Sequence, residues 1–508
     1  MTTQSLGLNA KITVFLSACT VFLSLLPATD ASAVPSYSRR YGVDCSTCHT
    51  MWGALNAAGV SFRLSGYRAI FGSDLTPTSE DMKVGGITLP TTLPLSFITG
   101  VGLDARRDKR SAAAGSATSS GSSLALEDAS IFMTSPLGQH LSAFVEFPMY
   151  ETKAWEFTPT GPAESRNVGA SRNIKFGTES PAFEVAKFFW NNLLGNSVPR
   201  DSVNLLGGIT HLPLAYSPGK VRLSVNQYLI YERTALDLIS PKKVEDVLGA
   251  EPNDVLFRLS EPQGLAEVNG MLTFGAPVTE ISKRETLWGE YHVGITNGSN
   301  NKAASRSQKD FYGRGVLRWY NQSLGLFAFR SGDLYGDDLR TTASLANPNG
   351  IMSGSQSANR VTRWGPDFTL SLAPMAIPVS LENQLMYNRE SNPTGFGEEF
   401  KWRGGFHQLN WQISRESIAY ARYDWVRGDA FNDTNRTMTV NGTPFTGITM
   451  ATPKEHDYVL GWQHLYEQNI KLVAEFRRHI FEDTASGAGV APSKLSDNGF
   501  TLRVMFGF

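Results

Sequence analysis

The feature that most constrains the fold is an alternation of apolar and polar residues, which is clearest at the end of the chain. In the final stretch, "GFTLRVMFGF", every second residue from Phe500 to Phe508 is apolar, and Thr501 and Arg503 stand between them. Successive side chains of a β-strand point to opposite faces, so this pattern predicts a strand with one apolar face. Similar stretches of about ten residues recur from Leu93 onward, separated by segments rich in Gly, Ser, Asn, Asp and Pro. Such a series predicts a transmembrane β-barrel.

Two internal stretches show which residues are expected on each face of the wall. In "LSAFVEF" the alternation turns Glu146 inward. In "TLWGEYHVGI" Leu287 and Ile295 would face lipid, whereas Glu290 and His292 would face the lumen. A soluble β-sandwich is the alternative. The number of strands, and the charged residues opposite an apolar face that no helix covers, favour the barrel.

We therefore expect a mostly-β fold in which residues 91–508 form an outer-membrane barrel of about 16, alternatively 18, antiparallel strands. The terminal Phe508 also resembles the C-terminal signal of bacterial outer-membrane barrels. The choice between the two strand numbers depends on residues 203–274, where "LDLISPKKVEDVL" breaks the alternation and is compatible with a helical insertion. A barrel of this size is expected to enclose an aqueous lumen, which a small N-terminal domain could plug.

Loop lengths predict how the barrel is oriented. The long segments between strands include residues 151–181, 332–358, 428–455 and 482–498, whereas "SPLGQ", "NQ", "PMA" and "SRES" are short. Outer-membrane barrels have long extracellular loops and short periplasmic turns. Both termini are therefore expected on the periplasmic side.

The first 33 residues have the three parts of a secretory signal. Lys11 precedes the apolar run "ITVFLSACTVFLSLL", and "ATDASA" ends at Ala33 in a cleavage pattern, which places the mature start at Val34. An alternative is lipidation at Cys19, because "LSAC" resembles a lipoprotein processing box. No later apolar run is long enough for a transmembrane helix. The formal net charge of -1 argues against a nucleic-acid partner.

Removal of the signal leaves only two of the three cysteines, and both stand in "CSTCH". This is the spacing of a c-type haem attachment site, in which Cys45 and Cys48 bond the porphyrin and His49 ligates iron. A two-thiol redox site, half of a zinc site and a disulfide are the alternatives. A zinc site requires two further ligands, and no Cys or His follows before His140. A redox site would need a thioredoxin-like βαβ context, which is absent.

Residues 34–90 are expected to form a small monohaem cytochrome c domain. Met51, Leu55, Ala58 and Phe62 recur at helical spacing and predict an amphipathic helix after the motif. Gly66 is placed to end that helix, and Gly59 has no side chain, which permits close approach of the haem or of another backbone segment. A domain this small requires additional stabilisation, which the covalent haem and the barrel can supply.

The second axial ligand of the iron is not fixed by the motif. Met51 is too close to His49 in the chain to reach the opposite haem face. Met82 is the only later Met or His in the small domain, and it is our candidate. A residue of the barrel wall, such as Met133, His140 or His292, and an open position are the alternatives.

The segment from Arg39 to Tyr67 resembles one known family, the fused monohaem cytochrome and porin proteins of iron-oxidising bacteria. The resemblance rests on a basic residue followed by Gly42, Cys45, Cys48, His49, Leu55, Asn56, Gly59, Phe62, Gly66 and Tyr67. It departs at Gly53, where many members have proline. The rest of the chain resembles the family only in architecture. The same segment is similar to haem segments of other single-haem barrel proteins, so it supports electron transfer more firmly than it supports iron.

The resemblance implies an outer-membrane conduit that carries one covalent haem c. Such a conduit takes electrons from extracellular Fe(II), or another donor, and passes them to a periplasmic c-type cytochrome or other acceptor. If it is catalytic, it is an iron(II):cytochrome c oxidoreductase. Two other functions stay open: a diffusion porin whose haem domain is a redox-sensitive plug, and a haem enzyme such as a peroxidase.

Overall fold

The structure is a computed structural model, and the residues that it describes fall within Val34–Phe508. The described residues are 36–52, 54–85, 87–112, 115–138, 140–152, 171–172, 184–216, 222–235, 238, 258–280, 286–297, 309–331, 359–391, 393, 399–440, 443–450, 452–483 and 493–508. The predicted signal segment, with Cys19, lies outside them. None of the helices in these ranges has the length and apolar character needed to cross a membrane.

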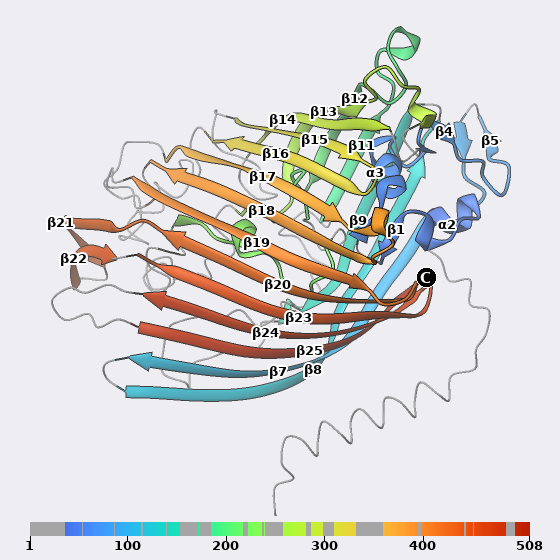
Figure 1. Ribbon diagram of the computed structural model, residues 1–508. Helices are drawn as coiled ribbons and strands as arrows, with labels where there is room; N and C mark the ends of the chain where they lie inside the picture. The colour runs from blue at the N-terminus through green and yellow to red at the C-terminus, as the bar shows by residue number, and fades with distance from the viewer. Residues whose placement is uncertain are drawn as a thin grey trace, which may run out of the picture. The chain divides into compact units, whose positions relative to one another are not determined.

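Among the described residues, sixteen antiparallel strands form a closed barrel, which confirms the expected fold and strand number. Each barrel strand pairs with the barrel strand that follows it in the chain (Figure 1). The short β10 comes between β9 and β11 in the chain, and the β21–β22 hairpin comes between β20 and β23. The strands are β7 (Leu95–Ala112), β8 (Gly115–Pro136), β9 (Leu141–Thr152), β11 (Val185–Trp190), β12 (Asn204–Thr210), β13 (Gln263–Leu272), β14 (Leu287–Thr296), β15 (Asp310–Trp319), β16 (Gln322–Arg330), β17 (Val361–Ser371), β18 (Val379–Glu390), β19 (Phe400–Gln412), β20 (Ser417–Gly428), β23 (Lys454–Glu467), β24 (Ile470–Asp483) and β25 (Ser493–Gly507). The two-residue β10 (Ser171–Arg172) pairs with β9, and β21 (Phe431–Val440) and β22 (Thr443–Met450) form a separate hairpin.

The last strand closes the barrel against the first. β25 pairs with β7 along its length, with Phe500 opposite Ala105. Beyond the strand, the backbone N–H of Phe508 donates to the carbonyl of Phe97 at 2.8 Å, and the reverse bond is 3.0 Å long. The rings of these two residues stack with centroids 6.3 Å apart. The terminal Phe therefore completes the seam, and no strand edge is left open there.

The two faces of the wall have opposite polarity. On β14, Leu287, Val293 and Ile295 are exposed, whereas Glu290 and His292 are only 2% and 5% exposed. This confirms the inward orientation expected for both residues. A water-soluble protein shows the reverse distribution, because apolar side chains are buried and charged ones are solvated. The outer surface is therefore the lipid-facing surface of a transmembrane barrel.

Exposed aromatic residues form a belt near each end of the barrel. Trp319 and Trp411 lie next to short turns at one end, and Trp190 is opposite Leu141, the residue that follows another short turn at this end. At the other end the exposed aromatic residues include Trp364, Tyr387 and Tyr458, with the ring centroids of the first two 4.9 Å apart in a stacked pair. Tryptophan and tyrosine prefer the two interfaces of a bilayer, so these belts mark its edges.

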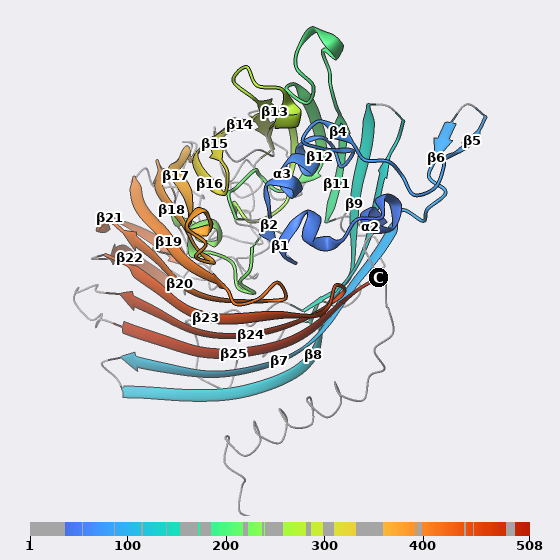
Figure 2. The ribbon, with the colours of Figure 1, turned by 45° about the vertical axis from the view of Figure 1, so that its right-hand side comes forward.

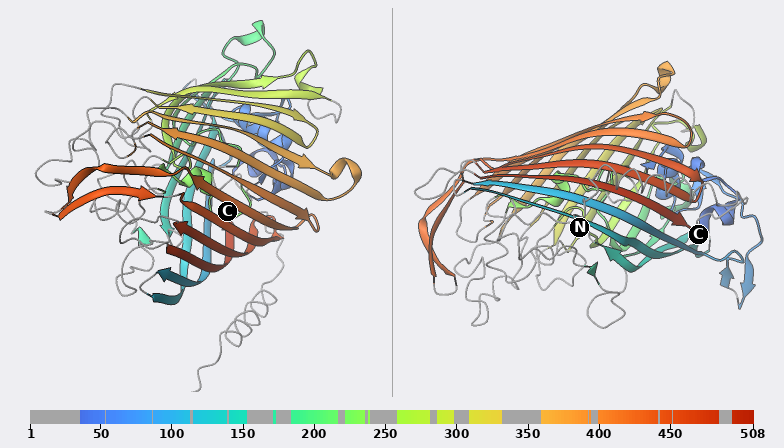
Figure 3. Two further views of the ribbon diagram at one scale, coloured as in Figure 1. Left: turned by 60° about the vertical axis from the view of Figure 1, so that its left-hand side comes forward. Right: turned by 90° about the horizontal axis from the view of Figure 1, so that it is seen from below.

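The C-terminus and the N-terminal domain lie at the short-turn end of the barrel (Figures 1 and 3). There the backbone N–H of Cys45 contacts Oε1 of Gln468, in the turn between β23 and β24, at 3.5 Å. The β21–β22 hairpin lies at the opposite end, which we call the long-loop end because the expected long segments connect the strands there.

The N-terminal domain consists of short elements. These are α2 (Ser36–Tyr41), the 3₁₀ turn η1 (Cys45–Thr47), β1 (His49–Met51), β2 (Ala54–Leu55), α3 (Ala57–Leu64), β3 (Ala69–Ile70), β4 (Ser73–Asp74), β5 (Met82–Val84) and β6 (Ile87–Leu89). The domain contacts opposing parts of the barrel wall: Asn204 of β12 donates to the carbonyl of Leu64 at 3.0 Å, and Lys471 of β24 donates to that of Trp52 at 3.1 Å. Figure 2 shows α3, β1 and β2 within the curve of the strands.

The helix that follows the motif is shorter than expected. Asn56 is its N-cap, since its side-chain oxygen accepts a hydrogen bond from the backbone N–H of Gly59 at 2.9 Å. Met51 and Leu55 therefore lie on β1 and β2 and not on the helix. Gly66 has φ of 64°, as expected of a residue that ends a helix.

A segment between β12 and β13 folds into the barrel, which the sequence did not predict. Residues 211–216 and 222–235, with the helix α4 (Leu229–Glu232), contact the inner wall on distant strands. Tyr216 Oη bonds Thr369 of β17 at 2.8 Å, and Ser224 Oγ donates to Glu475 of β24 at 2.7 Å. The segment thus crosses the lumen. The expected helical insertion, "LDLISPKKVEDVL", lies outside the described residues apart from Leu238.

Candidate functional site

The Cys-Ser-Thr-Cys-His motif is folded back onto the start of α3. The turn η1 is closed by a bond from the backbone N–H of Cys48 to the carbonyl of Cys45, 3.2 Å long. Asn56 then ties the motif down: its side-chain nitrogen donates to the carbonyls of Ser46 and Thr47, both at 3.1 Å. Its backbone N–H donates to the carbonyl of Cys48 at 3.0 Å. One asparagine therefore both caps the helix and fixes the motif.

Gly59 allows α3 to lie against the motif. A Cβ added to this glycine would lie 2.0 Å from the carbonyl oxygen of Cys48, which is backbone and cannot move aside. The close approach expected at Gly59 is therefore to the backbone of the motif itself.

A cavity of about 300 Å³ separates the motif from the barrel wall. Cys45, Cys48 and His49 line one part of it, together with other residues of the N-terminal domain. Residues of strands β7, β8, β9, β11, β12, β13 and β14 and the start of the inward segment, at residues 211–213, line the rest. Most of the lining is apolar, and its large aromatic residues are Tyr37, Trp52, Phe62, Tyr67, Phe132, Phe144 and Phe189. Binding sites for cofactors are of this kind: concave, largely apolar, and with a few placed polar groups.

Aromatic contacts hold the domain to the wall beside the cavity. The Tyr67 ring stacks on Phe144 of β9 at 5.5 Å and meets Phe189 of β11 edge-on at 5.4 Å. Nζ of Lys187 lies 5.0 Å from the Phe144 ring centroid, a favourable cation–π distance. These contacts fix the position of the domain against the strands that form the other side of the cavity.

The pKa values of the motif residues suit a haem site better than a redox-active pair of thiols or a zinc site, both of which require thiolates. Burial lowers the pKa of His49 to about 4, and the charge of Lys471 acts in the same direction. The ring is therefore neutral at neutral pH, as a metal ligand must be. Burial raises the pKa of Cys45, and it raises that of Cys48 to about 11. Redox-active C-x-x-C pairs have lowered thiol pKa values instead.

The structure separates the four residues considered as second axial ligand. Met82 is 50% exposed on the β5–β6 hairpin and does not line the cavity. Met133 is 40% exposed on the outer face of β8, and His140 is exposed in a short turn. His292 alone lines the same cavity as the motif and is buried.

The surroundings of His292 fix how its ring is presented. Nδ1 lies 2.8 Å from Oε1 of Glu267, whose carboxylate also accepts bonds from Asn269 at 2.8 Å and from Tyr312 Oη at 2.9 Å. Because a carboxylate only accepts, Nδ1 is the donor of this hydrogen bond. Nε2 is buried and has no hydrogen-bond partner among the described residues. An imidazole held by a carboxylate through one nitrogen, with the other nitrogen free, is the usual state of a metal-binding histidine.

His211 is a second histidine of the cavity that the sequence did not single out. Its Nδ1 lies 2.8 Å from the carbonyl oxygen of Ser260, and its Nε2 lies 3.8 Å from Oε1 of Glu184. No pattern in the sequence marks this residue, because it begins the inward segment and lies outside the alternating strands.

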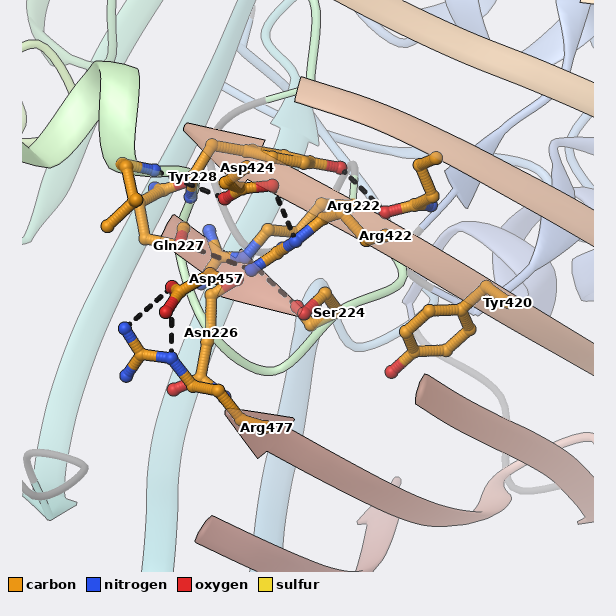
Figure 4. A network of polar contacts seen from close by, with 12 residues as sticks. Arg222, Ser224, Asn226, Gln227, Tyr228, Tyr420, Arg422, Asp424, Asp457 and Arg477 are labelled. Carbon is orange, nitrogen blue, oxygen red and sulfur yellow. Dashed lines mark hydrogen bonds and ion pairs between the residues drawn. The ribbon is translucent and has the colours of Figure 1, made fainter. Parts of the chain in front are cut away.

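Charged residues of the inner wall hold the inward segment in place (Figure 4). Nε of Arg422 lies 3.0 Å from Asp424, and its NH1 group donates to the carbonyl of Asn226 at 2.9 Å. The Arg422 guanidinium also lies 4.6 Å from the centre of the Tyr228 ring, which stacks on Phe406 at 3.9 Å. The segment is therefore joined to the wall by both charge and aromatic packing.

The closed barrel, its apolar outer face and its aromatic belts define a porin-like barrel of the outer-membrane class. Solved structures with a similar barrel include the outer-membrane channel DcaP of Acinetobacter baumannii, at 10% identity over 85% of this chain and 100% of that chain, with a TM-score of 0.44. An anion-selective porin from Comamonas acidovorans matches at 10% identity over 82% and 99%, with a TM-score of 0.44. OmpT of Vibrio cholerae matches at 9% over 85% and 100%, with a TM-score of 0.37. No family model and no curated protein matches the chain.

Proposed function

We propose that this protein carries one covalent haem c and transfers electrons across the outer membrane. The observation that carries the proposal is the shared cavity, which the three motif residues and His292 line from the domain and from the barrel wall. Cys45 and Cys48 would bind the porphyrin, and His49 and His292 would ligate its iron. When bound, the haem supplies reversible one-electron chemistry.

The residues of the chain have separate tasks in this function. The aromatic lining of the cavity excludes water, and Glu267 holds His292 in the orientation for binding. The barrel itself insulates the redox site, since a hydrocarbon layer about 30 Å thick does not carry charge. We place the short-turn end, and therefore both the motif and Phe508, on the periplasmic side, where a c-type cytochrome or another acceptor can approach.

Extracellular Fe(II) is the donor that the resemblance of residues 39–67 supports. In that reaction Fe(II) gives up one electron and becomes Fe(III), and the periplasmic acceptor gains the electron. When purified oxidised protein is mixed with Fe(II) without oxygen, we expect the absorption bands of reduced haem to appear. Oxidised cytochrome c, added next, should reverse them. Bands that respond to dithionite but not to Fe(II) would exclude iron as the donor and leave electron transfer from another donor intact.

A porin with a redox-sensitive plug is the second candidate, which the sixteen-stranded barrel favours. The inward segment argues against it, because Tyr228 and Tyr231 fill space inside the barrel and are fully buried. In planar lipid bilayers we therefore expect the purified protein to show no stable open-channel current steps. Its conductance should be the same after oxidation and after reduction.

The control for this measurement is the double variant Tyr228→Ala and Arg422→Ala, which removes the aromatic and charged contacts of the inward segment with the wall. We expect this variant to show current steps that the native protein lacks. Stable steps in the native protein that change with redox state would support the porin function instead.

A further inference from the structure

A row of three cationic side chains crosses the outer face of the barrel near the long-loop end. Arg403 of β19 is directly opposite Arg427 of β20, and Arg427 is directly opposite Lys454 of β23. Neighbours across paired strands lie about 5 Å apart, and like charges in such positions repel one another. A barrel has no structural need for this arrangement.

Carboxylates near the row are occupied by other cations. Glu482 of β24 is opposite Lys454 but accepts a bond from Lys494 at 2.6 Å. Glu399 is bound by Arg389 and by Lys401. In the part of the chain that the structure describes, Arg403 and Arg427 form no ion pair. The row therefore keeps an excess of positive charge that an external anion can neutralise.

The same three residues line a hollow in the surface. Its volume is about 540 Å³, and Tyr387, Trp425, His456 and Glu482 are among the residues that line it beside the cations. These side chains alternate along their strands with the buried Phe406, Val426 and Glu455, which face inward. The hollow is therefore on the lipid-facing side of the wall.

The row lies at the level of lipid headgroups. Tyr387, which is directly opposite Arg403, belongs to the aromatic belt of the long-loop end. Arg403 is on β19, and Trp411, which belongs to the belt at the short-turn end, is eight residues further along that strand. Eight residues span roughly 20 Å along the axis of a barrel whose strands tilt by about 40°. The cations thus stand at one edge of the apolar band and not within it.

We propose that Arg403, Arg427 and Lys454 form a binding site for the phosphate groups of a phosphorylated glycolipid in the outer leaflet of the membrane. The guanidinium groups match phosphate oxygens with two parallel hydrogen bonds, and Lys454 adds a third positive charge. Tyr387 and Trp425 supply the apolar and aromatic contact that a lipid headgroup region requires. The site rests on the orientation proposed above, with the long loops outside, and is independent of the haem.

The test compares lipid A with its dephosphorylated form as probes for the purified full-length protein in detergent. Arg427→Gln is expected to weaken lipid A binding about fivefold, and the triple variant Arg403→Gln, Arg427→Gln, Lys454→Gln by more than about fiftyfold. Arg415→Gln is the matched control, since it removes the same charge from an exposed turn at the other end. It should bind as the native protein does, and dephosphorylated lipid A should bind weakly to all of them.

Thermal unfolding shows whether the variants still fold. Because the substitutions remove repulsion, the triple variant without lipid should unfold at the same temperature as the native protein or higher. Lipid A should raise the unfolding temperature of the native protein and of Arg415→Gln but not that of the triple variant. Equal lipid A binding by the native protein and the triple variant would overturn the proposal. So would displacement of lipid A by millimolar inorganic phosphate, which would identify free phosphate as the ligand.

Discussion

Protein in which Cys45 and Cys48 are both replaced by serine is expected to contain no haem after denaturation in detergent, whereas the native protein keeps one haem per chain. The reason is chemical: only a covalent bond survives unfolding, and these are the two thiols left once the predicted signal is removed. Haem staining of denaturing gels and the haemochrome spectrum in alkaline pyridine measure the effect. The single variants should keep one bond each, with a spectrum shifted from that of the native protein.

Cys19→Ser is the matched control for this experiment. Cys19 precedes the expected cleavage site, so its replacement should leave the haem content unchanged, whereas a lipoprotein would lose its anchor. Covalent haem in the double serine variant would remove the basis of the proposed function. Zinc bound at one equivalent by the native protein, in place of haem, would do the same and would favour the zinc alternative.

The strands could be predicted because their signal is local. An alternation with a period of two assigns Glu290 and His292 to the lumen without knowledge of any other strand. The inward segment has no such signal, because its position depends on contacts with strands far away in the chain. Ser224 is 251 residues from its partner Glu475. Its mixture of aromatic and polar residues has no period, so an aqueous lumen plugged only by the N-terminal domain was predicted, without the buried Tyr228 and Tyr231 of this segment.

The candidate site was predicted in part for the same reason. The motif consists of three residues at a fixed spacing, which can be recognised in the sequence directly. The opposite wall of the cavity is formed by strands whose register cannot be read from the sequence. Asn269 is paired with His292 in the sheet, and this register brings Glu267 to the ring. Met82 was chosen because it is near the motif in the chain, but it lies on an exposed hairpin outside the cavity.

Replacing His292 by alanine is expected to convert the haem iron from the six-coordinate low-spin state to a five-coordinate high-spin state that binds carbon monoxide. Nε2 of His292 is a buried nitrogen of the cavity wall that has no hydrogen-bond partner among the described residues, and we expect its removal to leave the iron with His49 alone. His292→Met should keep six coordination and raise the midpoint potential by on the order of 100 mV, because a thioether favours the reduced iron. Visible absorption, electron paramagnetic resonance and redox titration measure these effects.

His211→Ala is the matched control, since His211 lines the same cavity and leaves the spin state unchanged if His292 is the ligand. Glu267→Gln should preserve low-spin iron and shift the midpoint potential by a few tens of mV, because the amide no longer draws the proton of Nδ1 toward itself. A low-spin spectrum in His292→Ala that is lost in Met82→Ala would show that the hairpin moves and supplies the ligand. High-spin iron that binds carbon monoxide in the native protein would instead leave the sixth position open, as a peroxidase requires. The spin state of the native protein therefore separates the electron conduit from the haem enzyme, and the spin states of the two variants identify the ligand.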